Sequence, residues 1–310
     1  MILCGYELEA GEKKRKKLLI SESQGMDVWL FCGTEAGKTL VVTAGVHGCE
    51  YVGIEAVKRL NDRIDPKNLH GNVIILPLVN PEGFLQGRKQ IMPEDEKNLN
   101  REFPGKWDGS YSSRAAYAIE QYVYPYADFL IDLHGGDCNE ALVPLVFCPT
   151  AGQPDVNEAA LAAAKTLSVQ YRVNSTARNG LYSWAVQKQI PALLLERGSG
   201  GNWSDDEVES CVNDVLRIMS YLGICDAEYE SVMQTEIRQA VYEEAEADGF
   251  WYPSVDAGKH ICEGECLGYL ETYPEGKRIE LSAKFDGIVL YYTTALGVKA
   301  GEPLAAYGKT

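Results

Sequence analysis

Two apolar stretches, KTLVVTAGV at residues 38–46 and NVIILPLV at residues 72–79, decide the fold class. Both are rich in β-branched residues, which is typical of strands that are covered on both faces. The apolar side chains of the segment between them, residues 51–64, have the spacing of a helical stripe: Ile54, Val57, Leu60 and Ile64. A strand, a helix and a second strand form a βαβ unit. The sequence therefore predicts an α/β fold with a mixed, mostly parallel sheet and helices on both faces.

The same alternation continues to about residue 225. Further elements are predicted as strands over residues 128–133, 141–147 and 192–195 and as a helix over residues 155–167. Another helix is expected from Ser204 to about Leu222, because Ser204 and Glu207 have the spacing of a capping box.

From about residue 234 the pattern changes to short alternating segments that are separated by glycines roughly every 10 residues. This spacing is typical of a small all-β domain. We therefore expect a catalytic domain over residues 1–230 and a β domain over residues 231–310. A length of 310 residues is sufficient for one large core and a smaller second one.

The charge balance excludes some classes of partner. Lys and Arg number 29 against 45 Asp and Glu, and the resulting net charge of -16 argues against nucleic acid or an anionic membrane as the main partner. The basic run at residues 13–17 is interpreted as a solvated turn or strand edge near the N-terminus.

Three further features indicate a cytoplasmic protein. No stretch approaches the roughly 20 apolar residues that span a bilayer, and the N-terminal residues lack the pattern of a secretory signal. The nine cysteines contain no C-x-x-C pair, and we interpret most of them as reduced, buried thiols.

Two histidines stand where predicted strands end. His47 follows the first strand, with Glu50 three residues later at the start of a helix, and His134 ends the strand of FLIDLHGG. Open α/β sheets build their sites at the carboxyl ends of strands. Two histidines and one glutamate, with a position left for water, form a catalytic zinc ligand set. The alternative is a chance spacing, with Gly135 and Gly136 serving only as turn residues.

A polar loop, NLNREFPG at residues 98–105, contains adjacent amide and guanidinium groups. Asn100 and Arg101 suit the capture of a substrate carboxylate, because the guanidinium fork matches carboxylate geometry. The alternative is a turn that carries a surface salt bridge.

Glu196 follows the apolar strand ALLL and precedes a glycine-rich loop. A carboxylate that emerges from a buried strand is a candidate general base, because desolvation raises its pKa. The alternative is a simple ion pair with Arg197 or another cation.

These residues occur in an order and at spacings that resemble the succinylglutamate desuccinylase/aspartoacylase family of the zinc carboxypeptidase superfamily. The resemblance covers nearly the whole chain, since members of that family commonly add a C-terminal β domain. The motifs that carry it are His47-Gly48-Cys49-Glu50, Asn98-Leu99-Asn100-Arg101, Phe103-Pro104-Gly105, Asp132-Leu133-His134 and Leu195-Glu196.

The resemblance implies roles for individual residues. His47, Glu50 and His134 match the ligands of one Zn²⁺ per chain. Glu196 matches the residue that activates water and later protonates the leaving amine. Asn100 and Arg101 match the pair that holds the substrate carboxylate.

The chain also departs from the family pattern. Asn98 stands where relatives usually have an aspartate that contacts a ligand histidine. The effect of this contact on metal binding is therefore expected to differ. Cys49 replaces another usual aspartate, between the ligands but not at a ligand position. Arg88 is the nearest candidate for the arginine that polarises the scissile carbonyl in this superfamily, although residues 89–97 do not match the family loop cleanly.

The C-terminal segment, residues 253–308, resembles the barrel-sandwich fold of biotinyl and lipoyl domains. The expected hairpin tip, residues 271–276, lacks the Met-Lys pair of a carrier, so a role in capping the catalytic cleft is favoured. Tyr291 and Tyr292 are interpreted mainly as packing residues.

The resemblance implies a zinc-dependent amidohydrolase that deacylates a small N-acyl amino acid or related N-acyl amine. The alternative is a metallocarboxypeptidase that acts on peptides or cell-wall fragments with the same residues, and a third reading is a non-catalytic binding protein on the same fold. The acyl group, the amine half and the oligomeric state, a homo-oligomer included, stay open.

Overall fold

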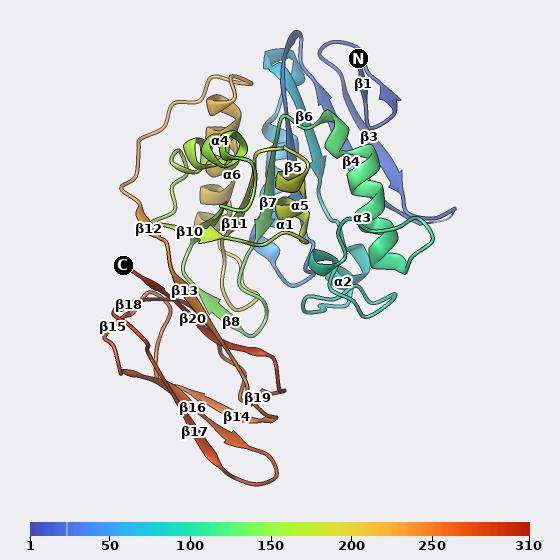
Figure 1. Ribbon diagram of the computed structural model, residues 1–310. Coiled ribbons are helices and arrows are strands. Elements are labelled where there is room, and N and C mark those ends of the chain that lie inside the picture. Colours follow the sequence, from blue (N-terminus) through green and yellow to red (C-terminus); the bar gives the residue numbers. More distant parts are fainter. Residues whose placement is uncertain (23) are drawn as a thin grey trace.

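The computed structural model describes residues 1–22 and 24–310 and consists of an α/β part and a C-terminal β part (Figure 1). Nine of the described strands form the large sheet of the α/β part, which in spatial order contains β12 (Thr235–Ile237), β10 (Tyr171–Ser175), β9 (Leu145–Pro149), β11 (Ala192–Glu196), β7 (Phe129–His134), β5 (Glu35–Ala44), β6 (His70–Leu76), β4 (Gly25–Cys32) and β3 (Lys13–Leu19). Strands β11, β7, β5 and β6 run parallel to one another, whereas β9 is antiparallel to β11 and β4 is antiparallel to both β3 and β6. The predicted α/β fold with a mixed, mostly parallel sheet is confirmed.

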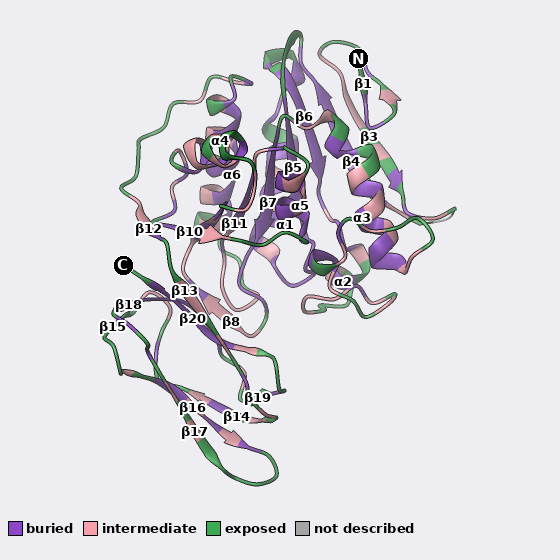
Figure 2. Cartoon of the chain, in the orientation of Figure 1, coloured by how far each residue is buried: buried purple, intermediate pink, exposed green. Residues whose placement is uncertain are grey.

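Helices cover both faces of this sheet. One apolar cluster packs one face against α1 (Tyr51–Arg63), α4 (Pro154–Ala164) and α6 (Asp205–Tyr221). A second cluster packs the other face against α3 (Tyr111–Tyr122) and α5 (Leu181–Gln187), and α2 (Pro81–Leu85) follows β6. The central strands are mostly buried (Figure 2), as their apolar sequences predict, although residues 35–38 of β5 are exposed. Within the described residues, no helix combines the length and apolar character that crossing a membrane requires.

The predicted capping box at the start of α6 needs two hydrogen bonds, and the structure contains one of them. Ser204 Oγ accepts a hydrogen bond from the Glu207 backbone N–H at 3.3 Å. The Glu207 carboxylate, which would complete a capping box, instead lies 3.2 Å from Arg197 Nη1. The helix is therefore capped by Ser204, and Glu207 ties it to the loop after β11.

The strand predicted over residues 141–147 is wrong as a single element. The structure contains two strands here, β8 (Glu140–Leu142) and β9 (Leu145–Pro149), with Pro144 between them. Proline has no backbone N–H to donate to a sheet, so it interrupts the pairing. β9 stays in the large sheet, whereas β8 pairs with β18 (Gly287–Thr293) of the C-terminal part.

The C-terminal part is all β, as predicted. Its first sheet contains β13 (Ala240–Glu244), β20 (Pro303–Lys309), β18 and β15 (His260–Ile261), and its second contains β17 (Arg278–Ser282), β16 (Cys266–Thr272), β14 (Gly249–Pro253) and β19 (Gly297–Val298). The remaining short elements are β1 (Ile2–Leu3), β2 (Tyr6–Glu7), η1 (Pro66–Asn68), η2 (Leu99–Arg101) and η3 (Tyr124–Tyr126).

The two parts share an apolar cluster at their junction. Its buried side chains come from the large sheet and from the C-terminal strands: Leu145, Tyr171, Val173, Ile237, Ile288, Leu290 and Ala306. The division at 230/231 stays a prediction. Strand pairing favours a later division, between Ile237 of β12 and Ala240 of β13.

The basic run of residues 13–17 lies in β3, the edge strand of the large sheet, which confirms its interpretation as a strand edge. Lys13 and Arg15 lie over the rings of Phe31 and Trp29 on the neighbouring β4, each 4.9 Å from the ring centroid. Charged side chains on an edge strand oppose pairing with a second molecule.

Candidate active site

Three neighbouring strands deliver the predicted catalytic residues. β11, β7 and β5 lie side by side and run parallel, so their carboxyl ends meet at one edge of the sheet. His47 follows β5, His134 ends β7 and Glu196 ends β11, directly opposite His134 in the strand register. Glu50 is the N-cap residue of α1, and its side chain is not used as a cap.

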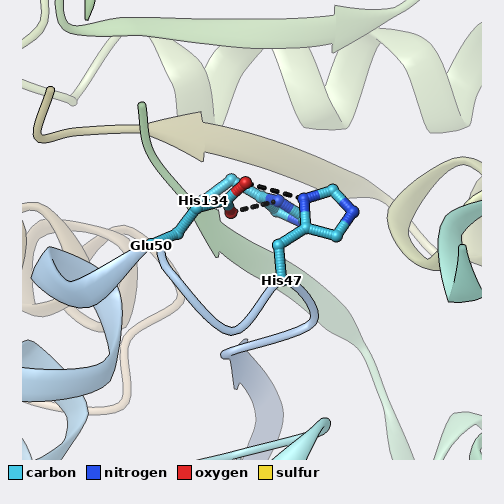
Figure 3. Close-up of side chains that lie close together, drawn as sticks. All are labelled: His47, Glu50 and His134. Carbon is cyan, nitrogen blue, oxygen red and sulfur yellow. Dashed lines mark hydrogen bonds and ion pairs between the residues drawn. The ribbon is translucent and has the colours of Figure 1, made fainter. Parts of the chain in front are cut away.

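His47, Glu50 and His134 converge through particular atoms (Figure 3). Glu50 Oε1 lies 2.6 Å from His47 Nδ1, and Glu50 Oε2 lies 2.8 Å from His134 Nδ1. All three side chains are buried. The two imidazoles therefore turn the same type of nitrogen toward one shared carboxylate.

The outer nitrogens of the two imidazoles contact acceptors. His134 Nε2 lies 3.0 Å from Asp132 Oδ2, and His47 Nε2 lies 3.3 Å from Asn98 Oδ1. An acceptor on the outer nitrogen holds a histidine in the tautomer whose other nitrogen binds a metal. The donor set of two Nδ1 atoms and one carboxylate therefore fits Zn²⁺.

The charges around the site also fit a cation. Burial acts to raise the pKa of Glu50, but the charges of His47 and His134 outweigh it and lower this pKa to about 2. Burial acts to lower the pKa of His134, but Asp132 and Glu50 raise it well above its usual value. Buried carboxylates here thus require positive charge, which a protonated histidine or a metal ion can supply.

Glu196 lines the same cavity as the three candidate ligands. Burial raises its pKa well above the usual range; His134 opposes this shift, whereas Glu50 and Glu140 add to it. The alternative of an ion pair with Arg197 is wrong. Arg197, the next residue, turns to the opposite side and lies 2.8 Å from Asp214 Oδ2 of α6.

Asn100 and Arg101 lie in η2, which Asn98 caps by accepting a hydrogen bond from the Asn100 backbone N–H. Asn100 Nδ2 lies 3.3 Å from His134 Nε2, and its Oδ1 accepts a hydrogen bond from the Leu181 backbone N–H. Arg101 is exposed and donates from Nη1 to the Asn100 carbonyl at 2.9 Å. Both side chains line the cavity of about 180 Å³ that contains the three candidate metal ligands, here called the ligand cavity. They also line a second cavity of about 540 Å³.

The structure does not bring Arg88 to the site. Its side chain is exposed, and it is absent from the described residues that line the two cavities. Its backbone N–H donates to the Gly83 carbonyl, just after α2. Gln90, two residues later, lines both cavities.

Sequence reasoning missed Glu140 and underestimated Tyr291, which both line the two cavities. They meet because β8 pairs with β18, and Tyr291 lies opposite Leu142 in this pairing. Burial and the charge of Glu50 raise the pKa of Glu140 to about 8. Tyr292 points elsewhere and donates from its hydroxyl to Asp256 at 3.5 Å. The proline between β8 and β9 was the signal in the sequence that the chain changes sheets here.

The glycines after His134 permit a close approach of two loops. A Cβ on Gly135 would lie 2.1 Å from the Arg197 carbonyl oxygen, and one on Gly136 would lie 2.6 Å from the Glu140 carbonyl oxygen. Neither glycine has a positive φ. Their interpretation as turn residues is therefore replaced by a steric requirement that positions the loop after β7 against the loop after β11.

Comparisons with known proteins agree with this arrangement. The family model of the succinylglutamate desuccinylase/aspartoacylase catalytic domain matches residues 36–222. The chain is 26% identical over 279 residues to the N-alpha-acetyl-L-2,4-diaminobutyric acid deacetylase of Halomonas elongata. The aligned region covers 87% of this chain and 81% of the relative.

Solved structures share the fold. The product-bound ectoine utilization protein EutE (DoeB) from Ruegeria pomeroyi has a TM-score of 0.84 and 24% identity, covering 93% of this chain and 90% of that one. A succinylglutamate desuccinylase/aspartoacylase from Rhodobacter sphaeroides has a TM-score of 0.86 and 23% identity, covering 99% of this chain and 98% of that one.

Proposed function

Because the chain belongs to the succinylglutamate desuccinylase/aspartoacylase family, we propose that it is a zinc-dependent deacylase of small N-acyl amino acids or related N-acyl amines. The observation that carries the proposal is the convergence of His47 Nδ1, His134 Nδ1 and the Glu50 carboxylate, with Glu196 on the adjacent strand. The Halomonas elongata relative is named for the removal of such an acyl group.

His47, Glu50 and His134 would hold the ion. When bound, Zn²⁺ supplies Lewis-acid polarisation of the scissile carbonyl and lowers the pKa of water toward about 7. Asp132 and Asn98 hold the two imidazoles in orientation through the outer nitrogens.

Glu196 serves as general base and then as general acid. Its raised pKa allows its carboxylate to take a proton from the attacking water near neutral pH. The carboxyl group then holds this proton and gives it to the nitrogen of the leaving amine. Glu196 lines the cavity that also contains His47, Glu50 and His134, which supports this role.

Asn100 and Arg101 orient the substrate. The exposed guanidinium of Arg101 and the amide of Asn100 face a shared cavity, so together they suit a carboxylate group of the substrate. Tyr242, Tyr291 and Pro303 of the C-terminal strands line one side of this cavity. A cavity that both parts of the chain line favours a small molecule over an extended peptide.

The proposal also covers cellular location. The nine cysteines, all within the described residues, are free thiols, and several of them are buried. Free thiols are typical of a reducing compartment, so we propose that the deacylase acts in the cytoplasm.

The experiment that tests this function compares Glu196→Gln with the wild-type chain on N-acetyl and N-succinyl amino acids, N-acetyl-2,4-diaminobutyrate and dipeptides. We expect the wild type to hydrolyse an N-acyl amino acid and to lose activity when a chelator removes the metal. Glu196→Gln should lower kcat by about 10²- to 10⁴-fold with unchanged zinc content.

Glu158→Gln on the exposed side of α4 is the matched control and should keep full activity. Full turnover by Glu196→Gln would contradict the mechanism. Faster cleavage of dipeptides than of every N-acyl amino acid would instead support the metallocarboxypeptidase alternative.

A further inference from the structure

A second cluster of potential metal ligands lies beside the candidate zinc centre. The Sγ atoms of Cys49 and Cys138 and a carboxylate oxygen of Asp137 all lie within 4.8 Å of one another. Cys49 and Asp137 are each 1% exposed, whereas Cys138 is exposed to solvent. The proposed deacylation uses none of these three side chains.

Asp137 has one occupied and one free oxygen. Its Oδ1 accepts a hydrogen bond from the Cys138 backbone N–H at 2.7 Å. Its Oδ2 is buried and has no hydrogen-bond partner among the described residues. A buried carboxylate oxygen without a partner is unfavourable, because it has lost its hydrogen bonds to water and no protein donor replaces them. This oxygen is therefore a candidate ligand for a cation next to the two thiols.

The loop that carries Asp137 and Cys138 is held in place by backbone hydrogen bonds. Gly136 N–H donates to the Gly198 carbonyl at 2.9 Å, and Gly201 N–H donates to the Gly136 carbonyl at 3.0 Å. A Cβ on Gly201 would lie 2.9 Å from Cys138 Cα, so the two loops are in close contact. The ligand atoms are thus positioned before any ion binds, which lowers the ordering cost of binding.

We propose that Cys49, Asp137 and Cys138 form a second metal site, which binds Zn²⁺ or another thiophilic divalent cation. Two sulfur ligands and one carboxylate suit a soft or borderline ion in a tetrahedral arrangement. Water completes the fourth position, and the exposed Cys138 provides the route of entry. Each thiol releases its proton to solvent as its sulfur binds the ion.

The position of this site indicates its role. Cys49 directly precedes Glu50, and Asp137 follows His134 by three residues. An ion held by Cys49 and by the 137–138 loop would join the two segments that carry Glu50 and His134. The second site therefore stabilises the geometry of the first, and its existence does not depend on which substrate the enzyme cleaves.

Cobalt substitution tests the proposal. The full-length protein is purified under reducing conditions, its Zn²⁺ is counted, and the ion is then replaced by Co²⁺. We expect two ions per chain and a thiolate-to-cobalt charge-transfer band in the near ultraviolet. A site of two histidines and one glutamate has no sulfur ligand, so it cannot produce that band.

Variants assign the band to its residues. Cys138→Ser and Asp137→Asn should each lower the metal content from two ions to one, and Cys138→Ser should abolish or strongly weaken the band. His47→Ala should also leave one ion but keep the band. Cys262→Ser, at an exposed cysteine of the C-terminal part, should change neither property.

Two results would overturn the proposal. One is a wild-type protein that binds one ion per chain without the band while both thiols react with a thiol reagent. The other is a disulfide between Cys49 and Cys138 in the protein purified under reducing conditions, found by mass spectrometry after alkylation. Loss of the band in Cys138→Ser with full deacylase activity would support the second site and contradict its role in stabilising the first.

Discussion

The outer nitrogens of the two candidate ligand histidines contact different acceptors, a carboxylate for His134 and a neutral amide for His47. A charged acceptor makes an imidazole a stronger ligand, so we predict that Asp132→Asn lowers Zn²⁺ affinity by about 10- to 100-fold. Asn98→Asp should raise the affinity, because it supplies the missing charge.

Competition with a chromophoric chelator measures both affinities. Asp108→Asn, in the exposed loop before α3, is the matched loss of one carboxylate and should leave the affinity unchanged. Equal affinities for wild type, Asp132→Asn and Asn98→Asp would show that these contacts do not tune the site.

Glu140 gives a prediction about pH. Burial and Glu50 raise its pKa to about 8 in the folded protein, whereas an unfolded chain loses this proton near pH 4.3. The folded state therefore binds more protons between these values, so its stability falls as the pH rises from about 4.3 to about 8. Glu140→Gln cannot ionise. We predict that it stabilises the metal-free protein at pH 8 by on the order of a few kcal/mol, with no gain near pH 4.

Urea unfolding at several pH values, after metal removal, checks the Glu140 prediction. Glu158→Gln, an exposed glutamate on α4, serves as the control and should parallel the wild type. A Glu140→Gln stability curve that also parallels the wild type across this pH range would be evidence against a buried, protonated Glu140.

A residue of the site can be predicted from the sequence when its position depends on a single nearby strand. His47, His134 and Glu196 could be predicted because each follows a buried strand, and parallel neighbouring strands end at one edge. Glu140 and Tyr291 could not be predicted, since their meeting depends on pairing between strands about 150 residues apart, which periodicity does not encode. Asp137 is not predictable for the same reason, because its surroundings are two loops from different strands.

At the scale of elements, α6 depends on a single cap. Ser204 Oγ accepts a hydrogen bond from the Glu207 N–H, and the carboxylate of Glu207 is engaged with Arg197. The Glu207 carboxylate therefore does not accept a hydrogen bond from the Ser204 backbone N–H. We predict that Ser204→Ala lowers the free energy of unfolding by about 1 kcal/mol.

Urea denaturation of the metal-loaded protein measures the effect of Ser204→Ala. Ser231→Ala, an exposed serine outside any helix or strand, is the control and should stay close to the wild type. If the two variants lost stability equally, the contribution of the cap would be refuted.

The predicted strands were correct where the whole apolar stretch lies in one sheet. β6, β7, β11 and residues 39–44 of β5 are mostly apolar and buried because helices cover them on both sides. The stretch 141–147 carries the same apolar character, yet its two halves belong to different sheets. Hydrophobic periodicity records whether a strand is buried and not which sheet buries it, so only Pro144 marked the division.

At the scale of the whole molecule, the C-terminal β part is joined to the α/β part in two ways. β8 leaves the α/β part to pair with β18, and the shared apolar cluster contains side chains from both parts. The composition change near residue 234 predicted that a second part exists. It could not predict this junction, because the cluster forms from residues that are ordinary strand residues in each sequence segment.

The junction places Tyr291 of β18 in both cavities, and this placement yields the last prediction. If the C-terminal part caps the cleft, then Tyr291→Ala enlarges the cavity that fits a small substrate. We predict that KM for the N-acyl amino acid rises about tenfold, equivalent to about 1.4 kcal/mol, and that dipeptide cleavage rises relative to it. Steady-state kinetics on both substrate classes measure this ratio. Tyr292→Ala removes the neighbouring ring, which contacts Asp256 outside the cavities, and should leave the ratio unchanged. An equal effect of the two substitutions would mean that the C-terminal part stabilises the fold without selecting the substrate.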